Sequence, residues 1–407
     1  MIEKRLIDIS KNISSGITPL RSNDEFWTDG TIPWLKTEQL GEKYIFDTNE
    51  YITEKALQEA NVKIFPENTL SIAMYGEGKT RGNVSILKRP MATNQACCNI
   101  ELDEEKVSSE YVYYFLKTQY ENLRGLSSGI RKNLNTNDIK NFVVRLPENL
   151  KTQQSIAAVL SALDKKIALN KQINVCLEEM AKTLYDYWFV QFDFPDANGK
   201  PYKSSGGEMV FDETLKREIP KGWEVKSLNQ VADIVMGQSP DGASYNLEQE
   251  GTIFFQGSTD FDWRFPNVRQ YTTSPTRFAQ KGDILLSVRA PVGDLNISPF
   301  ECCIGRGLAA LRSKSGNNSF LFYVMKYFKT VFERRNTEGT TFGSITKDDL
   351  HSLKLVAPAD NVLEKYNEIA SKYDEMIFIR SQQNHQLTQL RDFLLPMLMN
   401  GQVSVAE

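Results

Sequence analysis

Histidine is nearly absent from this 407-residue chain, which contains only His351 and His385. Histidine is the most frequent general acid and base in enzymes and a common metal ligand, so a site built on histidine is disfavoured. The five cysteines show no regular spacing, and Cys97-Cys98 and Cys302-Cys303 are adjacent pairs rather than the CxxC pairs of a zinc site. We predict that these pairs are buried in strands of a protein from a reducing cytoplasm.

Signatures of membranes, cofactors and catalysis are also missing. No apolar run is long enough to cross a bilayer, and residues 1–10 lack the apolar core of a signal peptide. The sequence contains no Rossmann-type glycine fingerprint, no Asn/Asp-Pro-Pro-aromatic segment of an adenine methyltransferase and no convincing PD…(D/E)xK nuclease core. Residues 76–80 resemble the end of a phosphate-binding P-loop, but Ala73 stands where that motif requires glycine. We therefore expect a cytoplasmic protein with no membrane partner, no catalytic residue, no metal and no cofactor of its own.

The charge balance leaves the partner open. The chain has 48 Lys and Arg against 52 Asp and Glu, a formal net charge of −4. This argues against a uniformly basic surface of the kind that coats nucleic acid. It does not exclude DNA binding, because a local basic face is sufficient for that.

What the sequence does contain is an internal repeat. The segment Ser15-Gly16-Ile17-Thr18-Pro19 matches Met236-Gly237-Gln238-Ser239-Pro240, at an offset of about 221 residues that also relates Gly30 to Gly251. Residues 68–73 match 283–288, and 134–139 match 345–350, with small drifts that loop insertions would produce. Because the same order recurs at four sites, the two halves are predicted to share one fold.

Each half is predicted to have a mixed part of about 150 residues followed by a long helix. The mixed part has short strand-like runs and one helix near its end, at residues 109–120 in the first half and 319–330 in the second. Between Lys151 and Phe189 there is no glycine or proline, and apolar or amide residues recur at alternating steps of four and three, which is a coiled-coil pattern. At about 1.5 Å per residue each long helix would measure roughly 50 Å.

The two predicted seams share a polar centre. The first seam consists of Ile156, Leu160, Leu163, Ile167, Asn170, Asn174, Leu177, Ala181, Leu184 and Trp188. The second consists of Tyr366, Ile369, Tyr373, Met376, Arg380, Gln383, Leu387, Leu390, Leu394 and Met397. Asn170 and Asn174 would meet Arg380 and Gln383 whether the helices run parallel or antiparallel, so this match leaves the direction open.

The repeat and the helices give five segments. We expect a first domain at 1–148, a long helix at 149–191, an exposed connector at 192–222, a second domain at 223–358 and a second long helix at 359–407. The fold class is α/β or α+β, with an internal pseudo-two-fold repeat. A helix pair alone would leave apolar surface exposed, so partner subunits are expected to cover it.

This organisation resembles the specificity subunits of type I restriction-modification systems over essentially the whole chain. The resemblance is carried by residues 32–37, 281–286 and Leu146-Pro147. The most specific match is the connector, at 202–209 and 218–223.

The resemblance implies two target-recognition domains that each read one half of a split double-stranded DNA site. It also implies that the helices pack antiparallel and act as a spacer between the half-sites. Two modification subunits that carry S-adenosylmethionine would dock on this scaffold, and two restriction subunits, which use ATP and Mg, can join. Half-sites one DNA turn apart, about 34 Å, are within reach of a spacer of this length.

Candidate DNA contacts are cations for phosphates and forked or amide side chains for base edges. Most of them follow predicted strands or lie in glycine-containing loops, and for any one of them a solvated surface loop is the simpler explanation. The first domain offers Lys36, Thr37, Gly76, Lys79, Arg81, Gln95, Ser128, Arg131 and Lys132. The second offers Gly257, Ser258, Arg289, Arg306, Thr340, Thr341 and Ser344.

Two other hypotheses compete with DNA recognition. A structural coiled-coil protein whose domains bind other proteins would show no salt-dependent affinity for DNA. An enzyme with an unrecognised site would be stabilised by ATP or S-adenosylmethionine. Neither explains the basic loops beside strand ends. The bases that would be read cannot be derived from the sequence, because such domains have no residue-to-base code.

Overall fold

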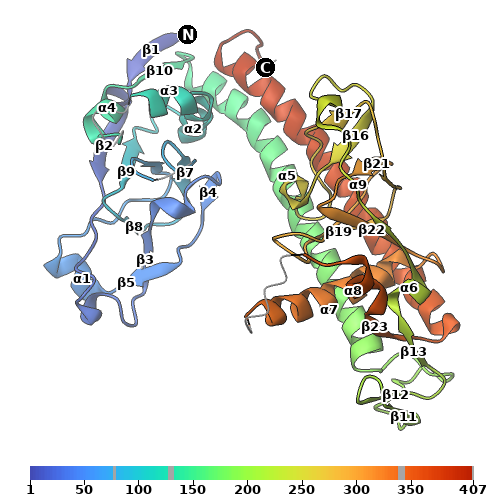
Figure 1. The fold of residues 1–407 in the computed structure, drawn as a ribbon. Coiled ribbons are helices and arrows are strands. Elements are labelled where there is room, and N and C mark those ends of the chain that lie inside the picture. The colour runs from blue at the N-terminus through green and yellow to red at the C-terminus, as the bar shows by residue number, and fades with distance from the viewer. Residues whose placement is uncertain (77–78, 127–132, 338–343, 406–407) are drawn as a thin grey trace. The chain divides into compact units, whose positions relative to one another are not determined.

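The computed structural model describes residues 1–76, 79–126, 133–337 and 344–405. These fall into two compact units: Met1–Leu169 with Gln383–Glu407, and Asn170–Gln382. Each long helix therefore contributes one part to each unit. Figure 1 shows the elements of both.

The first unit is built on three small sheets. A five-stranded sheet has the order β2-β9-β6-β7-β4, a three-stranded sheet the order β5-β3-β8, and β1 pairs with β10. The strands are β1 (Ile2–Arg5), β2 (Ser10–Ser15), β3 (Ile32–Leu35), β4 (Tyr44–Ile45), β5 (Glu50–Ile52), β6 (Leu70–Ala73), β7 (Val84–Leu87), β8 (Ala92–Thr93), β9 (Cys97–Leu102) and β10 (Val143–Leu146). The helices are α1 (Glu54–Glu59), α2 (Ser109–Thr118), α3 (Tyr120–Gly125) and α4 (Thr136–Lys140).

The second unit repeats this plan. One four-stranded sheet has the order β14-β22-β19-β20, one five-stranded sheet the order β15-β17-β16-β21-β18, and β13 pairs with β23. The strands are β13 (Glu224–Ser227), β14 (Ala232–Met236), β15 (Tyr245–Asn246), β16 (Thr252–Phe255), β17 (Tyr271–Thr272), β18 (Phe278–Ala279), β19 (Ile284–Ser287), β20 (Leu295–Ile297), β21 (Cys302–Ile304), β22 (Leu308–Ser313) and β23 (Lys354–Ala357). The helices are α6 (Leu228–Val231), α7 (Asn318–Thr337) and α8 (Lys347–Ser352).

Equivalent backbone hydrogen bonds show that the repeat is structural. The amide of Gly16 donates to Cys97 O at 3.2 Å, and that of Gly237 donates to Leu308 O at 2.9 Å. The amide of Leu134 donates to Met74 O at 3.1 Å, as that of Ile345 does to Val288 O at 2.8 Å. Capping boxes also recur, with Asn135 and Asp138 on α4 and Thr346 and Asp349 on α8. The sequence repeat thus predicted the shared fold correctly.

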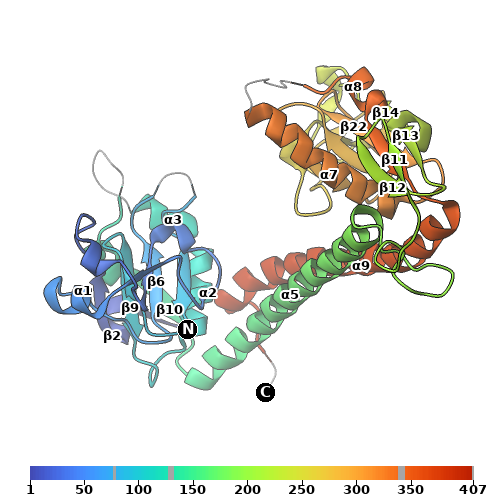
Figure 2. The same cartoon turned by 90° about the horizontal axis from the view of Figure 1, so that it is seen from below.

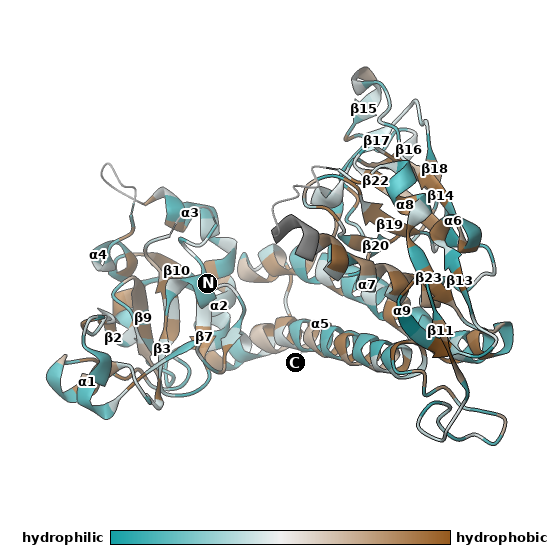
Figure 3. Ribbon diagram, turned by 60° about the horizontal axis from the view of Figure 1, so that its bottom comes forward, coloured by the Kyte–Doolittle hydropathy of each residue, from teal (hydrophilic) through white to brown (hydrophobic). Residues whose placement is uncertain are grey.

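The core of each unit joins its sheet to its helices. In the first unit, buried residues of β6, β9 and α2 pack with Leu160 and with Leu398. In the second, buried residues of β19, β22 and α7 pack with Ala181 and Tyr366. Hydrophobic residues gather on these strands of the second unit, while α5 alternates hydrophobic and hydrophilic along its length (Figure 3). Burial of apolar surface on the helix pair therefore anchors the mixed domain of each unit to the helices.

Within the first unit, α1 and α2 lie on opposite sides (Figure 2). Helix α2 packs against β7 and the helix pair, whereas α1 covers the small sheet β5-β3-β8 through Ala56. The small sheet is therefore the part of the domain away from the helices.

The long helices are α5 (Leu150–Tyr185), which continues as a π-helical turn over Asp186–Val190, and α9 (Asp360–Met399). Within the first unit, Arg391 Nη1 donates to Asp164 Oδ1 at 3.0 Å and Asn384 Nδ2 to Ile167 O at 3.2 Å. Within the second, Tyr366 Oη donates to Ala181 O at 3.4 Å and Asn174 Nδ2 to Ser381 Oγ at 3.1 Å. Residue numbers fall on one helix as they rise on the other in both units, so the helices are antiparallel in each.

The seam predicted for α5 is buried or half-buried, but the seam predicted for α9 is wrong at four of its ten positions. Ile369, Met376, Gln383 and Leu390 are exposed. Ala370 and Ile377 are instead fully buried, and Asn384 and Arg391 face α5. Both stripes satisfy the alternating steps of three and four. Packing against α5 and the mixed domain selects, in place of each of the four exposed residues, the next residue along the chain.

The polar centre consequently has a different composition from the predicted one. Asn174 Nδ2 donates to Ser381 Oγ at 3.1 Å, and Asn170 is 1% exposed. Arg380 donates to Met376 O of its own helix instead of to α5. The polar layer is therefore formed by amide and hydroxyl groups rather than by a buried guanidinium.

The connector at 192–222 contradicts the prediction of an exposed linker in part. Phe192 and Phe194 are buried against Trp223, and β11 (Met209–Asp212) pairs with β12 (Arg217–Pro220). The aromatic residues fix both ends of the connector to the second unit, while residues 203–206 stay exposed.

The adjacent cysteines are buried in strands β9 and β21 as predicted. Burial raises the pKa of Cys97, Cys98 and Cys302 to about 12.

Candidate nucleic-acid interface

In the second unit, the ends of several strands bring polar side chains to one edge of the domain. Strand β19 leads into Arg289, whose backbone forms an antiparallel bridge with Ser344. The preceding amide, of Val288, donates to Gly307 O at 2.9 Å, which places Arg289 beside the Arg306 loop. The Arg306 amide in turn donates to Ser239 Oγ at 3.3 Å. Residues far apart in the sequence therefore meet along this edge.

The end of β16 joins the same edge. The amide of Gly305 donates to Phe255 O at 2.9 Å, and a Cβ at Gly307 would lie 2.7 Å from Gln256 O. Gly257 and Ser258 follow at the start of a 3-10 helix, Ser258–Asp260. We call the exposed or half-exposed residues of this edge the second edge: Gln238, Ser239, Gln256, Gly257, Ser258, Arg289, Arg306 and Ser344.

The first unit forms an equivalent edge with other side chains. The amide of Met74 donates to Ala96 O at 2.8 Å, which sets Tyr75 beside Gln95. Thr18 donates a hydrogen bond to the Gln95 side chain, and the amide of Asn94 donates to Leu35 O at 2.9 Å, next to Lys36. The first edge therefore consists of Thr18, Lys36, Thr37, Tyr75, Gly76 and Gln95.

The two edges differ in their electrostatics. Lys36 Nζ lies 2.8 Å from Glu38 Oε1 and 2.6 Å from Glu50 Oε1, and these hydrogen-bonded carboxylates raise its pKa. Within the described ranges, Arg289 and Arg306 form no ion pair with a carboxylate. The second edge thus presents two uncompensated guanidinium groups, whereas the first presents mainly an amide, hydroxyls and a charge-neutralised lysine.

Several predicted contacts lie in or beside segments without a described placement. Ser128, Arg131, Lys132, Thr340 and Thr341 fall outside the described residues. Lys79 is exposed, and its carbonyl accepts a hydrogen bond from Tyr120 Oη at 2.6 Å. Arg81, three residues after Gly78, is half-buried. Both follow Gly76, whose φ is +139°, in the chain, and they are cations of the first unit outside the first edge as defined above.

Sequence reasoning missed five residues of the edges: Thr18, Tyr75, Gln238, Ser239 and Gln256. Tyr75 adjoins the predicted Gly76 and Gln256 adjoins the predicted Gly257, and the repeat aligns Thr18 with Ser239, so the alignment itself offered a signal for that pair. At the same offset Gln256 corresponds to Leu35, which is buried whereas Gln256 is exposed, so the repeat offered no signal for Gln256.

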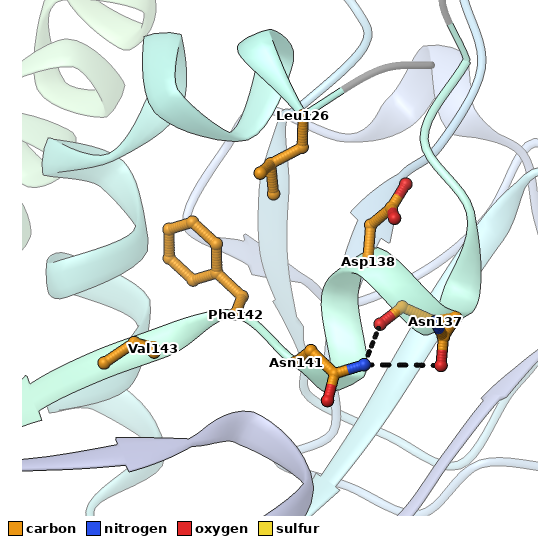
Figure 4. A pocket seen from close by; sticks show the side chains of 6 residues that line it. All are labelled: Leu126, Asn137, Asp138, Asn141, Phe142 and Val143. Carbon is orange, nitrogen blue, oxygen red and sulfur yellow. Dashed lines mark hydrogen bonds between the residues drawn. The ribbon is translucent and has the colours of Figure 1, made fainter. Parts of the chain in front are cut away.

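No enzyme-like site is apparent among the described residues. Among them, no group of three or more His, Cys, Asp or Glu could hold a metal ion. A shallow hollow of about 350 Å³ beside α4 is lined by Leu126, Asn137, Asp138, Asn141, Phe142 and Val143. In this hollow Asn141 Nδ2 hydrogen-bonds to the backbone and side chain of Asn137, at 3.0 and 3.3 Å (Figure 4). The Asp138 carboxylate accepts from the backbone amide of Asn135, so the polar groups of this hollow are engaged in local hydrogen bonds.

The sequence matches the profile of the type I restriction modification DNA specificity domain twice, over residues 2–179 and 220–389. The chain therefore belongs to the family of type I restriction-modification specificity subunits. No helix in the described part of the chain is both long and apolar enough to span a membrane.

Relatives support this assignment. The chain is 37% identical over 283 residues to the MjaX specificity subunit of Methanocaldococcus jannaschii, covering 68% of this chain and 62% of that protein. It is 29% identical to the MjaIX specificity subunit of the same organism, over 99% of this chain and 94% of the relative. The fold is similar to that of the S subunit of a type I system from M. genitalium, with a TM-score of 0.65 and 16% identity over 98% of this chain and 95% of the other.

Proposed function

We propose that this chain is the non-catalytic, DNA-reading subunit of a type I restriction-modification complex. The observation that carries the proposal is the pair of equivalent edges, built on the same backbone hydrogen bonds but carrying different side chains. Arginine and amide side chains at loop tips are the groups that contact phosphates and base edges. Two domains that share a backbone arrangement but carry different side chains at these edges suit a split DNA site whose two halves differ in sequence.

The chemistry would belong to partner subunits. Two modification subunits with S-adenosylmethionine would methylate a flipped-out adenine, and two restriction subunits with ATP and Mg would join for cleavage. The helix pair would supply their docking surface, because Leu169, Met180 and Phe393 are among its exposed hydrophobic residues. The complex would act on DNA in the cytoplasm.

Methylome sequencing tests the proposal most directly. Cells that express this chain with its modification subunit should carry a split motif with a fixed gap, and cells lacking this chain should not. Exchanging residues 1–148 for those of a relative should change one half of the motif and leave the other unchanged. If the chain binds the modification subunit but no motif depends on it, the proposal is wrong and a scaffold that binds only proteins takes its place.

A further inference from the structure

Among the described residues, each recognition domain has one buried cation whose charged end contacts the helix pair. In the first unit it is Lys43, which lies between a 3-10 helix (Thr37–Gln39) and β4 and is 9% exposed. In the second it is Arg264, between the 3-10 helix Ser258–Asp260 and β17, which is 2% exposed. Lysine and arginine are almost never this buried unless they are paired.

Lys43 and Arg264 are equivalent residues of the repeat. They are related by the same sequence offset as Gly16 and Gly237. The structure gives an independent match, because Lys43 O accepts from the amide of Ile86 in β7 at 2.8 Å, and Arg264 O accepts from that of Ile297 in β20 at 2.9 Å. The cation therefore occupies one position of a duplicated scaffold.

In the first unit, Lys43 reaches both α2 and α5. Its Nζ donates to Ser161 Oγ on α5 at 2.6 Å and to Tyr114 Oη on α2 at 3.0 Å, and lies 3.3 Å from Glu110 Oε2 on α2. Tyr114 Oη also donates to Asp164 on α5 at 2.5 Å, and Arg391 of α9 binds the other oxygen of that carboxylate. The chain of polar contacts thus runs from the domain through α2 to both long helices.

In the second unit, Arg264 makes the equivalent connection with other partners. It pairs with Asp374 of α9, and its Nη1 lies 3.8 Å from Glu178 Oε1 of α5. Its guanidinium carbon lies 3.8 Å above the ring of Phe322 on α7. Ser319 of α7 donates to the second oxygen of Asp374 at 2.6 Å, and Lys326 of the same helix pairs with Glu178. Figure 1 shows α7, which carries three of these residues.

A contribution to folding stability does not by itself explain why a buried cation contacts the long helices in both domains. A buried ion pair is often no more stable than a well-packed apolar contact, because both charges lose their hydration. What a buried polar network does impose is position, since an apolar face can slide along a helix while charged and hydrogen-bonded groups must remain beside their partners. A slip of one helical turn, about 5.4 Å, would separate Arg264 from both of its carboxylates. In the first unit the same slip would separate Lys43 from Ser161 and Tyr114 from Asp164, although Lys43 would keep Glu110 of α2.

We infer that Lys43 and Arg264 are positioning residues that fix each recognition domain at one position along the helix pair. By doing so they fix the gap between the two DNA half-sites. This rests on the proposed function. A slip of about 5.4 Å exceeds the rise of one base pair, about 3.4 Å, so even one turn would alter the gap. The residues act through the placement of the domain and do not contact DNA.

The test is selection of DNA by the full chain in complex with its modification subunit. The pool contains the two wild-type half-sites separated by random gaps of varied length. The variants are Lys43→Met and Arg264→Met, with the charge-keeping variants Lys43→Arg and Arg264→Lys. The exposed residues Lys106 and Lys226, changed to Met, are the controls for each unit.

For the neutral variants, the preference for the wild-type gap over its neighbours should fall about tenfold, while the selected bases of both half-sites stay the same. Charge-keeping variants and controls should keep the wild-type gap. If a methionine variant fails to fold, Ser161→Ala and Ser319→Ala remove one hydroxyl from each network and should broaden the gap to a smaller degree.

Unchanged gap selection in folded neutral or hydroxyl variants would overturn the inference while leaving the proposed function in place. Selection of altered bases at an unchanged gap would do the same, because it would assign the cations to base reading. If the wild-type complex selects no split site at all, the proposed function fails and the inference fails with it.

Discussion

Two glycines at matching positions permit the close approach of strands in both domains. A Cβ at Gly16 would lie 2.1 Å from Thr93 O, and one at Gly237 would lie 2.2 Å from Gly305 O. Backbone atoms cannot move aside as the end of a flexible side chain can. Neither glycine has a positive φ, so it is the space and not the backbone conformation that requires glycine there.

Gly237→Ala should therefore destabilise the second unit by about 1–3 kcal/mol or more, through overpacking. Gly242→Ala is the matched control, because nothing lies within 4 Å of its added Cβ. Chemical denaturation of the purified chain measures both. Equal stabilities for the two variants would contradict the close approach seen at Gly237.

Acid should weaken the first unit through Glu110. Burial opposes ionisation of this carboxyl, but hydrogen bonds from Ser161 and Tyr44 and the charge of Lys43 outweigh it and lower its pKa. A lowered folded-state pKa contributes stability that is present above the unfolded value, about 4.3, and is lost as the pH falls through the folded value.

Glu110→Gln should therefore be less stable than the wild type at pH 7, with a difference that shrinks below about pH 4. Thermal unfolding at a series of pH values checks this, and Glu105→Gln, at an exposed position, is the control. A difference independent of pH would show that the Glu110 charge contributes nothing.

At the scale of elements, the corrected stripe of α9 makes a sharp comparison possible. Ile377 is fully buried, while its neighbour Met376 is 37% exposed. Ile377→Ala should cost about 2–5 kcal/mol of stability, whereas Met376→Ala should cost less than about 1 kcal/mol. Urea denaturation of the isolated chain distinguishes them. A larger loss of stability for Met376→Ala than for Ile377→Ala would show that the stripe predicted from the sequence is the buried one.

The error in that stripe shows where sequence reasoning reaches its limit. The seam predicted for α5 is buried or half-buried, although α5 also carries exposed apolar residues such as Leu169 and Met180 outside that seam. Helix α9 carries apolar residues in two neighbouring stripes, with Ile369 and Met376 in one and Ala370 and Ile377 in the other. Tertiary contacts with α5 and α7 decide between them, and these contacts are not encoded in the local period.

Some strands were predictable for a different reason. The repeat presents the run at residues 68–73 a second time at 283–288, so each weak pattern supports the other, and strands β6 (Leu70–Ala73) and β19 (Ile284–Ser287) lie in these runs, one residue out of the predicted match. The connector lacked this support, and its buried Phe192 and Phe194 were hidden among glycine, proline and serine. The buried cations were missed as well, because a lone lysine or arginine between strands gives no local signal.

For the whole molecule, the two edges predict unequal contributions to DNA affinity. Arg289→Ala with Arg306→Ala should weaken binding and lower the salt slope by about 0.9 for each DNA phosphate that is no longer neutralised. Lys36→Ala should lower the slope less, since Glu38 and Glu50 already compensate its charge.

Binding of a full-length split site at several salt concentrations measures these slopes, with Lys226→Ala as the control. Preference at the half-site of the first unit should be unchanged in the arginine variant. Equal reductions in slope for Lys36→Ala and the arginine variant would show that the carboxylates do not neutralise the lysine when DNA is bound.

The division of the polar network between domain and helices also bears on how such proteins diversify. Lys43 belongs to the segment 1–148 that an exchange would replace, whereas Ser161, Asp164 and Arg391 remain with the recipient. Glu110, the carboxylate partner of Lys43, would be exchanged together with it. A domain acquired from another lineage must therefore bring polar groups that suit Ser161 and Asp164 of the recipient. Under the proposed function, recombination would be free to vary the side chains of the edge, while the residues that contact the helix pair would have to stay compatible with the recipient.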